Sequence, residues 1–290
     1  MDKQGRIILI SDIYNESGSI IPWGLNLAKQ TGSDLDILHI IDPRENHGVE
    51  SPVSDSQSIT PGEKLTHEEI LKREKAKAER ALGKLLSKEV SRFNYSLKVE
   101  TIIVTEYMEE GLKKIFKERH GSLLITSSEL EDTVFTDSDE LLSIVRDLNE
   151  PVFIVPPGSH FQKPEKVFML ADFSKSPGLE LRSVFKWLTP FKPLVSAGEV
   201  AKKMDMIVKL ELTSKTWEKG VKKLIDPNIT LKTNQLKGRA SVGAVENYVT
   251  RNKFDWVIIP KSKKDSTKKL FPVDISKKLV KSIDKPLLLY

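Results

Sequence analysis

The sequence predicts an α/β protein made of two tandem, doubly wound, mostly parallel five-stranded sheets. Each half opens with an apolar run that leads into an aspartate, at residues 6–12 and 166–172. Each half also closes with a helix-like stretch, a proline and a second apolar run, around Pro151 and Pro286. Proline disfavours a helical residue ahead of it and suits the first position of a strand. The continuous apolar runs are typical of parallel strands covered on both faces.

In the first half, strand-like and helix-like segments alternate. Apolar residues at helical spacing follow the first apolar run, and Thr31-Gly32 provides a helix stop. Thr66 and Glu69 form a capping-box pattern at the start of a long charged helix. The expected order is strand 6–11, helix 20–30, strand 35–41, helix 66–90, strand 97–104, helix 108–119, strand 122–126, helix 141–148 and strand 152–155.

Two segments interrupt this alternation. Residues 43–64 are rich in Ser, Pro, Asp and Gly without periodicity, which predicts a mobile insertion. Residues 156–164 are polar and proline-rich, which is typical of a stiff linker. We therefore divide the chain into a domain at 1–158 and a shorter, more divergent domain at 159–290.

The second half repeats the pattern less clearly. Its expected elements are strand 166–171, helix 178–188, strand 229–233, helix 240–251, strand 254–259, a last helix and strand 287–290. Between residues 189 and 228 no clean pattern decides the topology, although 193–200 can form a strand and 206–224 can contain a helix. We expect the halves to pack as a pseudo-two-fold pair, with the strands at Val152 and Leu287 near their contact.

Composition indicates a water-soluble intracellular protein. The 290-residue chain is 39% hydrophobic and 30% charged, and it has no cysteine. The absence of cysteine excludes disulfides and thiolate metal sites, and it is consistent with a reducing cytoplasm. The polar start has no signal-peptide pattern, and no apolar run is long enough to span a bilayer. We expect a cytoplasmic protein without a membrane partner.

The net charge of +5 conceals a difference between the halves. Residues 1–160 carry 19 basic and 28 acidic side chains, whereas residues 161–290 carry 27 basic and 13 acidic ones. Opposite charges can favour docking of the halves, or they can give the second half an anionic partner such as nucleic acid or phosphate. Divergence of the surface charge of the two halves without a functional cause explains the difference equally well.

Several segments together resemble the universal stress protein family. They are residues 8–12, 38–42 and the proline-strand ending in the first half, and residues 171–174 and 270–274 in the second. The resemblance covers the whole chain as a tandem pair. It implies a five-stranded α/β fold related to nucleotide-binding sheets, and a contact between the two copies like that between single-copy members. The resemblance also implies that two copies of the tandem chain can form a homodimer.

ATP-binding members of that family carry G-x2-G-x9-G-[ST] after the fourth strand, and both copies here depart from it. Glycine lets the backbone approach phosphate oxygens and turns N–H groups toward them. The first copy has Thr126-Ser127-Ser128-Glu129, followed by acidic residues that would repel a triphosphate. The second has Pro260-Lys261-Ser262-Lys263. ATP or AMP is therefore possible but disfavoured, and we expect no cofactor.

The resemblance nevertheless identifies candidate ligand positions in each copy. Asp12 and Asp172 occupy the place of the family's adenine-contacting Asp, although an Asp at a strand end is equally a turn or capping residue. The lysine-rich loop of the second copy, which begins at Lys261, can bind phosphate through its side chains, or it can be an exposed loop without a ligand. The candidates are Asp12, Ile40, Thr126 and Ser127 in the first copy, and Asp172, Ser174, Lys261, Ser262, Lys263 and Lys264 in the second.

Signatures of catalysis are missing from the sequence. It has no P-loop, dinucleotide fingerprint or hydrolase elbow. The five histidines are scattered, which makes a metal site improbable, and His39 within its apolar strand is interpreted as a buried structural residue. We expect a non-catalytic stress-response or regulatory interaction module with degenerate nucleotide loops. The alternatives are a nucleotide or phosphoryl-ligand sensor that uses the Lys/Ser loop, and nucleic-acid binding through the basic half.

Overall fold

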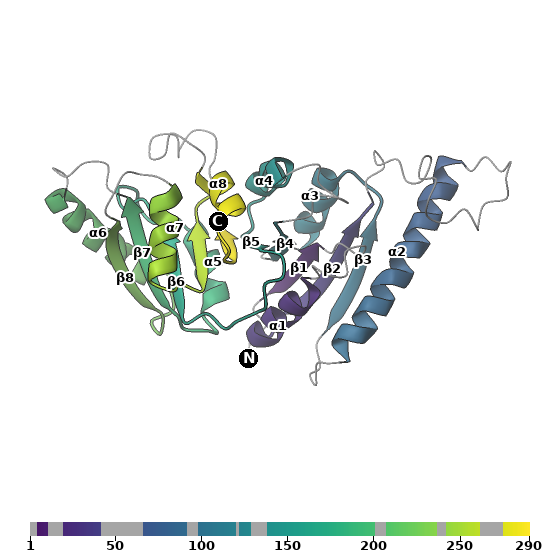
Figure 1. The fold of residues 1–290 in the computed structure, drawn as a ribbon, viewed down its shortest axis with the longest axis horizontal. Coiled ribbons are helices and arrows are strands. Elements are labelled where there is room, and N and C mark those ends of the chain that lie inside the picture. The colour runs from purple at the N-terminus through teal and green to yellow at the C-terminus, as the bar shows by residue number, and fades with distance from the viewer. Residues whose placement is uncertain are drawn as a thin grey trace.

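The strands of both halves join into one mixed ten-stranded sheet with helices on both faces (Figure 1). This is a computed structural model, and it describes residues 5–10, 20–41, 66–91, 98–119, 122–128, 138–200, 207–236, 242–261 and 275–290. The predicted insertion at 43–64 lies outside them. Among the described helices, none is both long enough and apolar enough to cross a membrane.

The first half alternates strands and helices, with β1 at the centre of its parallel sheet. Its spatial strand order is β3-β2-β1-β4-β5. The predicted capping box is present, because Thr66 accepts from the Glu69 N–H and the Glu69 carboxylate accepts from the Thr66 N–H. The elements are β1 (Arg6–Ile10), α1 (Ile21–Thr31), β2 (Asp34–Ile40), α2 (His67–Val90), β3 (Val99–Val104), α3 (Met108–Glu118), β4 (Leu123–Ser127), α4 (Ser138–Asp147) and β5 (Val152–Val155).

The second half has the same topology, with spatial order β8-β7-β6-β9-β10. It settles the segment that sequence patterns left open: residues 194–200 form a strand and residues 207–222 a helix. Ser196, Gly198 and Glu199 interrupt the apolar pattern of that strand. The elements are β6 (Lys166–Leu170), α5 (Glu180–Leu188), β7 (Leu194–Val200), α6 (Ile207–Lys222), β8 (Thr230–Leu236), α7 (Val242–Arg251), β9 (Trp256–Ile259), α8 (Ile275–Ser282) and β10 (Leu287–Leu289).

The halves meet at an antiparallel pair of strands, β5 and β10, which we call the seam. Val152 lies opposite Leu289, Phe153 opposite Leu288, and Ile154 opposite Leu287. The pairs around the seam, β4 with β5 and β9 with β10, are parallel. The same five-stranded order therefore runs outward in both directions, which confirms that the strands at Val152 and Leu287 lie at the contact.

Two apolar layers hold the helices to the sheet, and each layer spans both halves. One contains buried side chains of α1, α2, α5 and α6, and the other contains those of α3, α4, α7 and α8. Burial of apolar surface stabilises a fold by about 25 cal/mol per Å². Because both layers continue across the seam, that stabilisation is shared between the halves.

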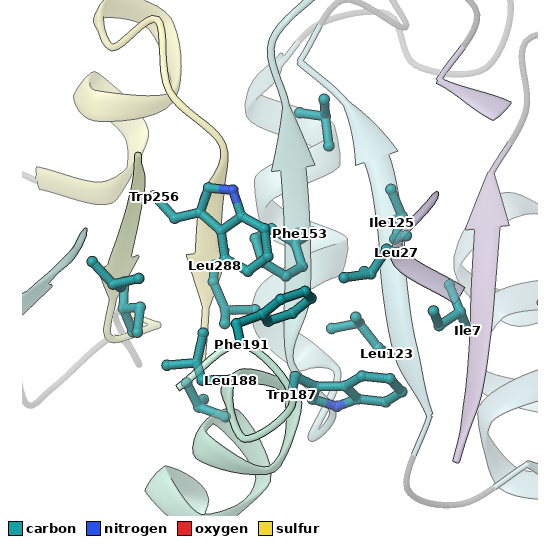
Figure 2. Packing of buried hydrophobic residues seen from close by; sticks show 14 of the residues in the cluster. Ile7, Leu27, Leu123, Ile125, Phe153, Trp187, Leu188, Phe191, Trp256 and Leu288 are labelled. Carbon is teal, nitrogen blue, oxygen red and sulfur yellow. The ribbon is translucent and has the colours of Figure 1, made fainter. Parts of the chain in front are cut away.

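An aromatic cluster crosses the seam inside the first of these layers. The Trp256 ring lies 4.9 Å from that of Phe153, 6.0 Å from that of Trp23 and 5.3 Å from that of Phe191. Figure 2 shows Phe153, Phe191 and Trp256 grouped around Leu288 of β10. Aromatic pairs at such separations contribute about 0.5–1.5 kcal/mol beyond the area that they bury. The predicted fold class is confirmed, with the two sheets fused into one, and the exact domain boundary at 158 stays a prediction.

Candidate functional site

The fold places one candidate site in each half, at the carboxyl ends of the central strands. In open α/β sheets, ligands bind where the strand order reverses. That point lies between β1 and β4 in the first half, and between β6 and β9 in the second.

Three of the four first-half candidates flank the end of β1. Ile40 ends β2, and Thr126 and Ser127 end β4, while β1 lies between those strands. Ile40 and Thr126 are fully or almost fully buried, and Ser127 is also buried. The fourth candidate, Asp12, lies outside the described residues. The structure thus gathers the described candidates at one edge, with their side chains largely withdrawn from solvent.

The backbone N–H groups just beyond β4 and β9 take part in the sheet. Ser128 N–H donates to the Val155 carbonyl at 3.1 Å, and Lys261 N–H donates to the Tyr290 carbonyl. In a phosphate-binding loop such groups point toward the anion. Here the first N–H after each strand is directed to the neighbouring strand.

Asp172 organises the turn that follows β6. Its Oδ1 accepts from the Ser174 N–H at 3.1 Å and from the Ser174 hydroxyl at 2.5 Å, and its Oδ2 lies 3.6 Å from the Lys175 Nζ. This is the local Asx-type bonding of a turn residue. The turn interpretation of Asp172 therefore holds, and Ser174 is its partner.

Lys261 reaches across the seam. Its Nζ donates to the main-chain carbonyls of Leu148, at 2.8 Å, and of Glu150, at 2.5 Å. Both acceptors lie between α4 and β5, in the other half of the protein. The ammonium that we assigned to a phosphate loop is thus engaged with backbone. Ser262, Lys263 and Lys264 lie outside the described residues.

A partly buried tyrosine was not recognised from the sequence. Burial raises the pKa of the Tyr290 phenol far above its usual value, and the negative charges of Glu180 and Asp172 raise it further. Both acids therefore lie close enough to the end of β10 to act on the Tyr290 phenol. The sequence gives little indication of this environment, because Tyr290 follows an apolar strand and is far in sequence from both acids.

A charge network at the start of β1 was also not recognised. Asp36, which has no exposed surface, pairs with Arg6 at 2.7 Å through Oδ1 and with Arg119 through Oδ2. Glu100 accepts from Arg6 at 3.0 Å, and hydrogen bonds from Lys98 and then Arg6 lower its pKa. Burial, and then the charge of Arg6, lowers the pKa of Arg119. The network lies at the end of β1 opposite the candidate site, so we assign it to stability.

Metal chemistry receives no support from the described part of the chain. No group of three or more acidic, histidine or cysteine side chains there is arranged to hold a metal ion. His39 is buried in β2 and has an interaction partner, in agreement with its structural interpretation.

The comparisons with known proteins agree on the fold. No family model matches the chain, and no curated protein does. A universal stress protein from Archaeoglobus fulgidus superposes with a TM-score of 0.66 at 13% identity, covering 99% of this chain and 96% of that chain. A putative universal stress protein from Pseudomonas aeruginosa UCBPP-PA14 gives 0.55 at 11% identity, covering 98% and 91%. A functionally unknown protein from Pseudomonas aeruginosa PAO1 gives 0.54 at 11% identity with the same coverage.

Proposed function

The chain has the fold of the universal stress proteins over nearly its whole length, and on that premise we propose that it is a non-catalytic regulatory or interaction module. In this role both ligand edges have lost the phosphate-binding chemistry, and the paired halves, which share one sheet, present the interaction surface. The proposal places the protein in the cytoplasm, in a stress response.

The observation that carries this proposal is the backbone pairing beyond β4 and β9. Anion cradles need consecutive free N–H groups that converge on one point. The N–H groups of Ser128 and Lys261 instead complete hydrogen bonds with Val155 and Tyr290. A nucleotide would have to break these two hydrogen bonds before either N–H could donate to it. The N–H groups farther along both loops, at residues 129–137 and 262–274, lie outside the described residues.

Electrostatics support the same conclusion in the second half. In addition to burial, the negative charges of Glu180 and Asp172 raise the pKa of the Tyr290 phenol. A phosphate group placed near them would meet like charges, whose repulsion is on the order of 1 kcal/mol per close pair in a partly shielded site. The Lys175 ammonium, 3.6 Å from Asp172, offsets part of that repulsion. Lys261, the loop lysine that lies within the described residues, donates to two carbonyls.

Titration calorimetry with ATP, ADP, AMP and cyclic nucleotides tests the proposal. We expect no saturable heat at millimolar ligand. The double variant Asp172→Asn, Glu180→Gln is the matched probe of the second-half edge, since it removes the repelling charges without changing side-chain size. Saturable micromolar binding by the native chain would refute the degenerate-site proposal. If nucleotide binding appears only in the double variant, the electrostatic argument is supported.

A phosphoryl-ligand sensor remains the second candidate, and Lys261 is the residue that bears on it. Such a ligand would have to replace Leu148 and Glu150 as partners of the ammonium. Titration with inorganic pyrophosphate distinguishes this candidate, because binding that is abolished by Lys261→Met would favour the sensor over the interaction module.

An anionic macromolecule is a third candidate, favoured by exposed lysines at the outer end of the second half. Lys215, Lys219, Lys222 and Lys223 are exposed on or just after α6, and Lys232 is exposed on the edge strand β8. Nucleic-acid affinity should then fall with salt at a slope set by the number of phosphates neutralised. Binding that vanishes at physiological salt would reduce this candidate to general electrostatics.

Self-association belongs to the same proposal. Closed dimers are the commonest symmetric assemblies of soluble proteins. We propose a homodimer that forms through surfaces other than the seam, since β5 and β10 already pair within the chain. Light scattering coupled to size exclusion measures this directly, and a monomer at all concentrations would contradict it.

A further inference from the structure

The Lys261 ammonium, just beyond the carboxyl end of β9, connects the two halves. Lys261 Nζ donates to two main-chain carbonyls, Leu148 and Glu150, in the short connection between α4 and β5. Both hydrogen bonds are partly buried. The C-terminal end of a helix carries partial negative charge on its unpaired carbonyls, which favours a cation there.

The position of Lys261 has a backbone counterpart in the first half. Lys261 N–H donates to the carbonyl of Tyr290, the residue after β10, just as Ser128 N–H donates to the carbonyl of Val155, the last residue of β5. Ser128 and Lys261 therefore occupy equivalent places beyond β4 and β9. Serine is too short to span the seam as lysine does, so Ser128 cannot make the equivalent contact from the first half.

The two hydrogen bonds of Lys261 are strong relative to the short strand pairing that they support. The seam consists of three residue pairs between β5 and β10. Hydrogen bonds from a charged donor contribute more than neutral ones, because the donor carries a full charge. Two such bonds at one end of a short strand pair can decide how often that end opens.

We propose that Lys261 is a one-sided latch between the halves, which couples the chain leaving β9 to the connection between α4 and β5. In the latched state the ammonium caps α4 and holds β5 against β10. In the unlatched state that end of the seam opens while the rest of the sheet stays intact. The latch goes beyond the proposed function and does not depend on it.

Hydrogen–deuterium exchange on the full chain tests the latch through three variants. Lys261→Met removes the ammonium and keeps an unbranched apolar stem. Lys261→Arg keeps the charge and the donors. Lys278→Met makes the same substitution at an exposed lysine of α8 and is the matched control. The reporters are residues 148–155 and 286–290, with β2 (residues 34–40) as an internal reference.

The latch predicts a localised change. In Lys261→Met, exchange at the seam reporters should be roughly tenfold to a hundredfold faster, while β2 exchanges as in the native chain. Lys261→Arg should keep most of the protection, and Lys278→Met should keep all of it. Unchanged seam exchange in Lys261→Met would overturn the proposal, as would an equal acceleration of the seam and β2. If Lys261→Met does not fold, Lys261→Gln, which retains an uncharged donor, should show the same local effect at smaller size, and its absence would also overturn the latch.

Discussion

The Asp36 carboxylate, fully withdrawn from solvent, accepts a hydrogen bond from Arg6 Nη1 at 2.7 Å. Its second oxygen pairs with Arg119, which follows α3. This pairing ties the start of β1 to β2 and to the end of a covering helix. Buried ion pairs add little over apolar packing, but they become costly once one partner is removed.

Asp36→Asn should therefore destabilise the protein by about 3 to 5 kcal/mol, because two arginines lose the charge of their buried partner. Urea denaturation followed by circular dichroism measures the loss. Asp34→Asn is the control, since Asp34 lies 3.7 Å from Arg6 and retains some exposure. We expect that control to cost well under half as much, and equal costs would contradict the assigned role of Asp36.

The raised pKa of Tyr290 makes stability depend on alkaline pH. The folded state keeps the phenol protonated at pH values where the unfolded chain, with a pKa of about 10, begins to lose the proton. The contribution of Tyr290 is therefore complete below about pH 10 and is lost as pH rises further. Tyr290→Phe keeps the ring and should flatten this alkaline decline in the free energy of unfolding. An identical pH profile for both proteins would show that Tyr290 titrates normally.

Gly198 in β7 leaves room for an aromatic ring. A Cβ at this position would lie 2.6 Å from Cε2 of Phe168, whose ring also packs against Tyr248 and Phe254. Gly198→Ala should cost roughly 1 to 3 kcal/mol through overpacking. Gly83→Ala on α2 is the matched control, because no atom lies near its Cβ position, and it should stabilise by about 0.5 to 1 kcal/mol. Thermal unfolding of both variants checks the two opposite signs.

Substitution of Trp256 tests whether the two halves unfold as one unit. Trp256→Ala should cost about 3 to 5 kcal/mol and should separate unfolding into two transitions, since the aromatic cluster at the seam is lost. Trp217→Ala removes a buried ring that packs on Phe173 within the second half. It should cost a similar amount without dividing the transition at the seam. One shared transition in Trp256→Ala would show that the other seam contacts suffice.

The sequence predicted the repeating elements because their signals are local. Apolar runs, helix stops and the Thr66 capping box depend on neighbouring residues, and the strands begin and end within a few residues of the expected positions. The strand and helix between residues 189 and 228 were harder, since Ser196, Gly198 and Glu199 break the apolar pattern of β7.

The site was less predictable because its contacts are distant in sequence. Lys261 resembles a phosphate-loop lysine by its neighbours, and only the packing of the two halves brings Leu148 and Glu150 within reach. Asp36 likewise acquires its role from Arg119, beyond α3. In both cases the partner is fixed by tertiary packing, which no local pattern encodes.

Native mass spectrometry of freshly purified protein tests the central claim most directly. A chain whose phosphate-binding edges have been lost should appear at its own mass, 32.8 kDa, or at multiples of it, without a retained nucleotide. The same spectrum should persist after incubation with excess ATP followed by buffer exchange. A stoichiometric adenine nucleotide on the native chain, before or after incubation, would contradict the account.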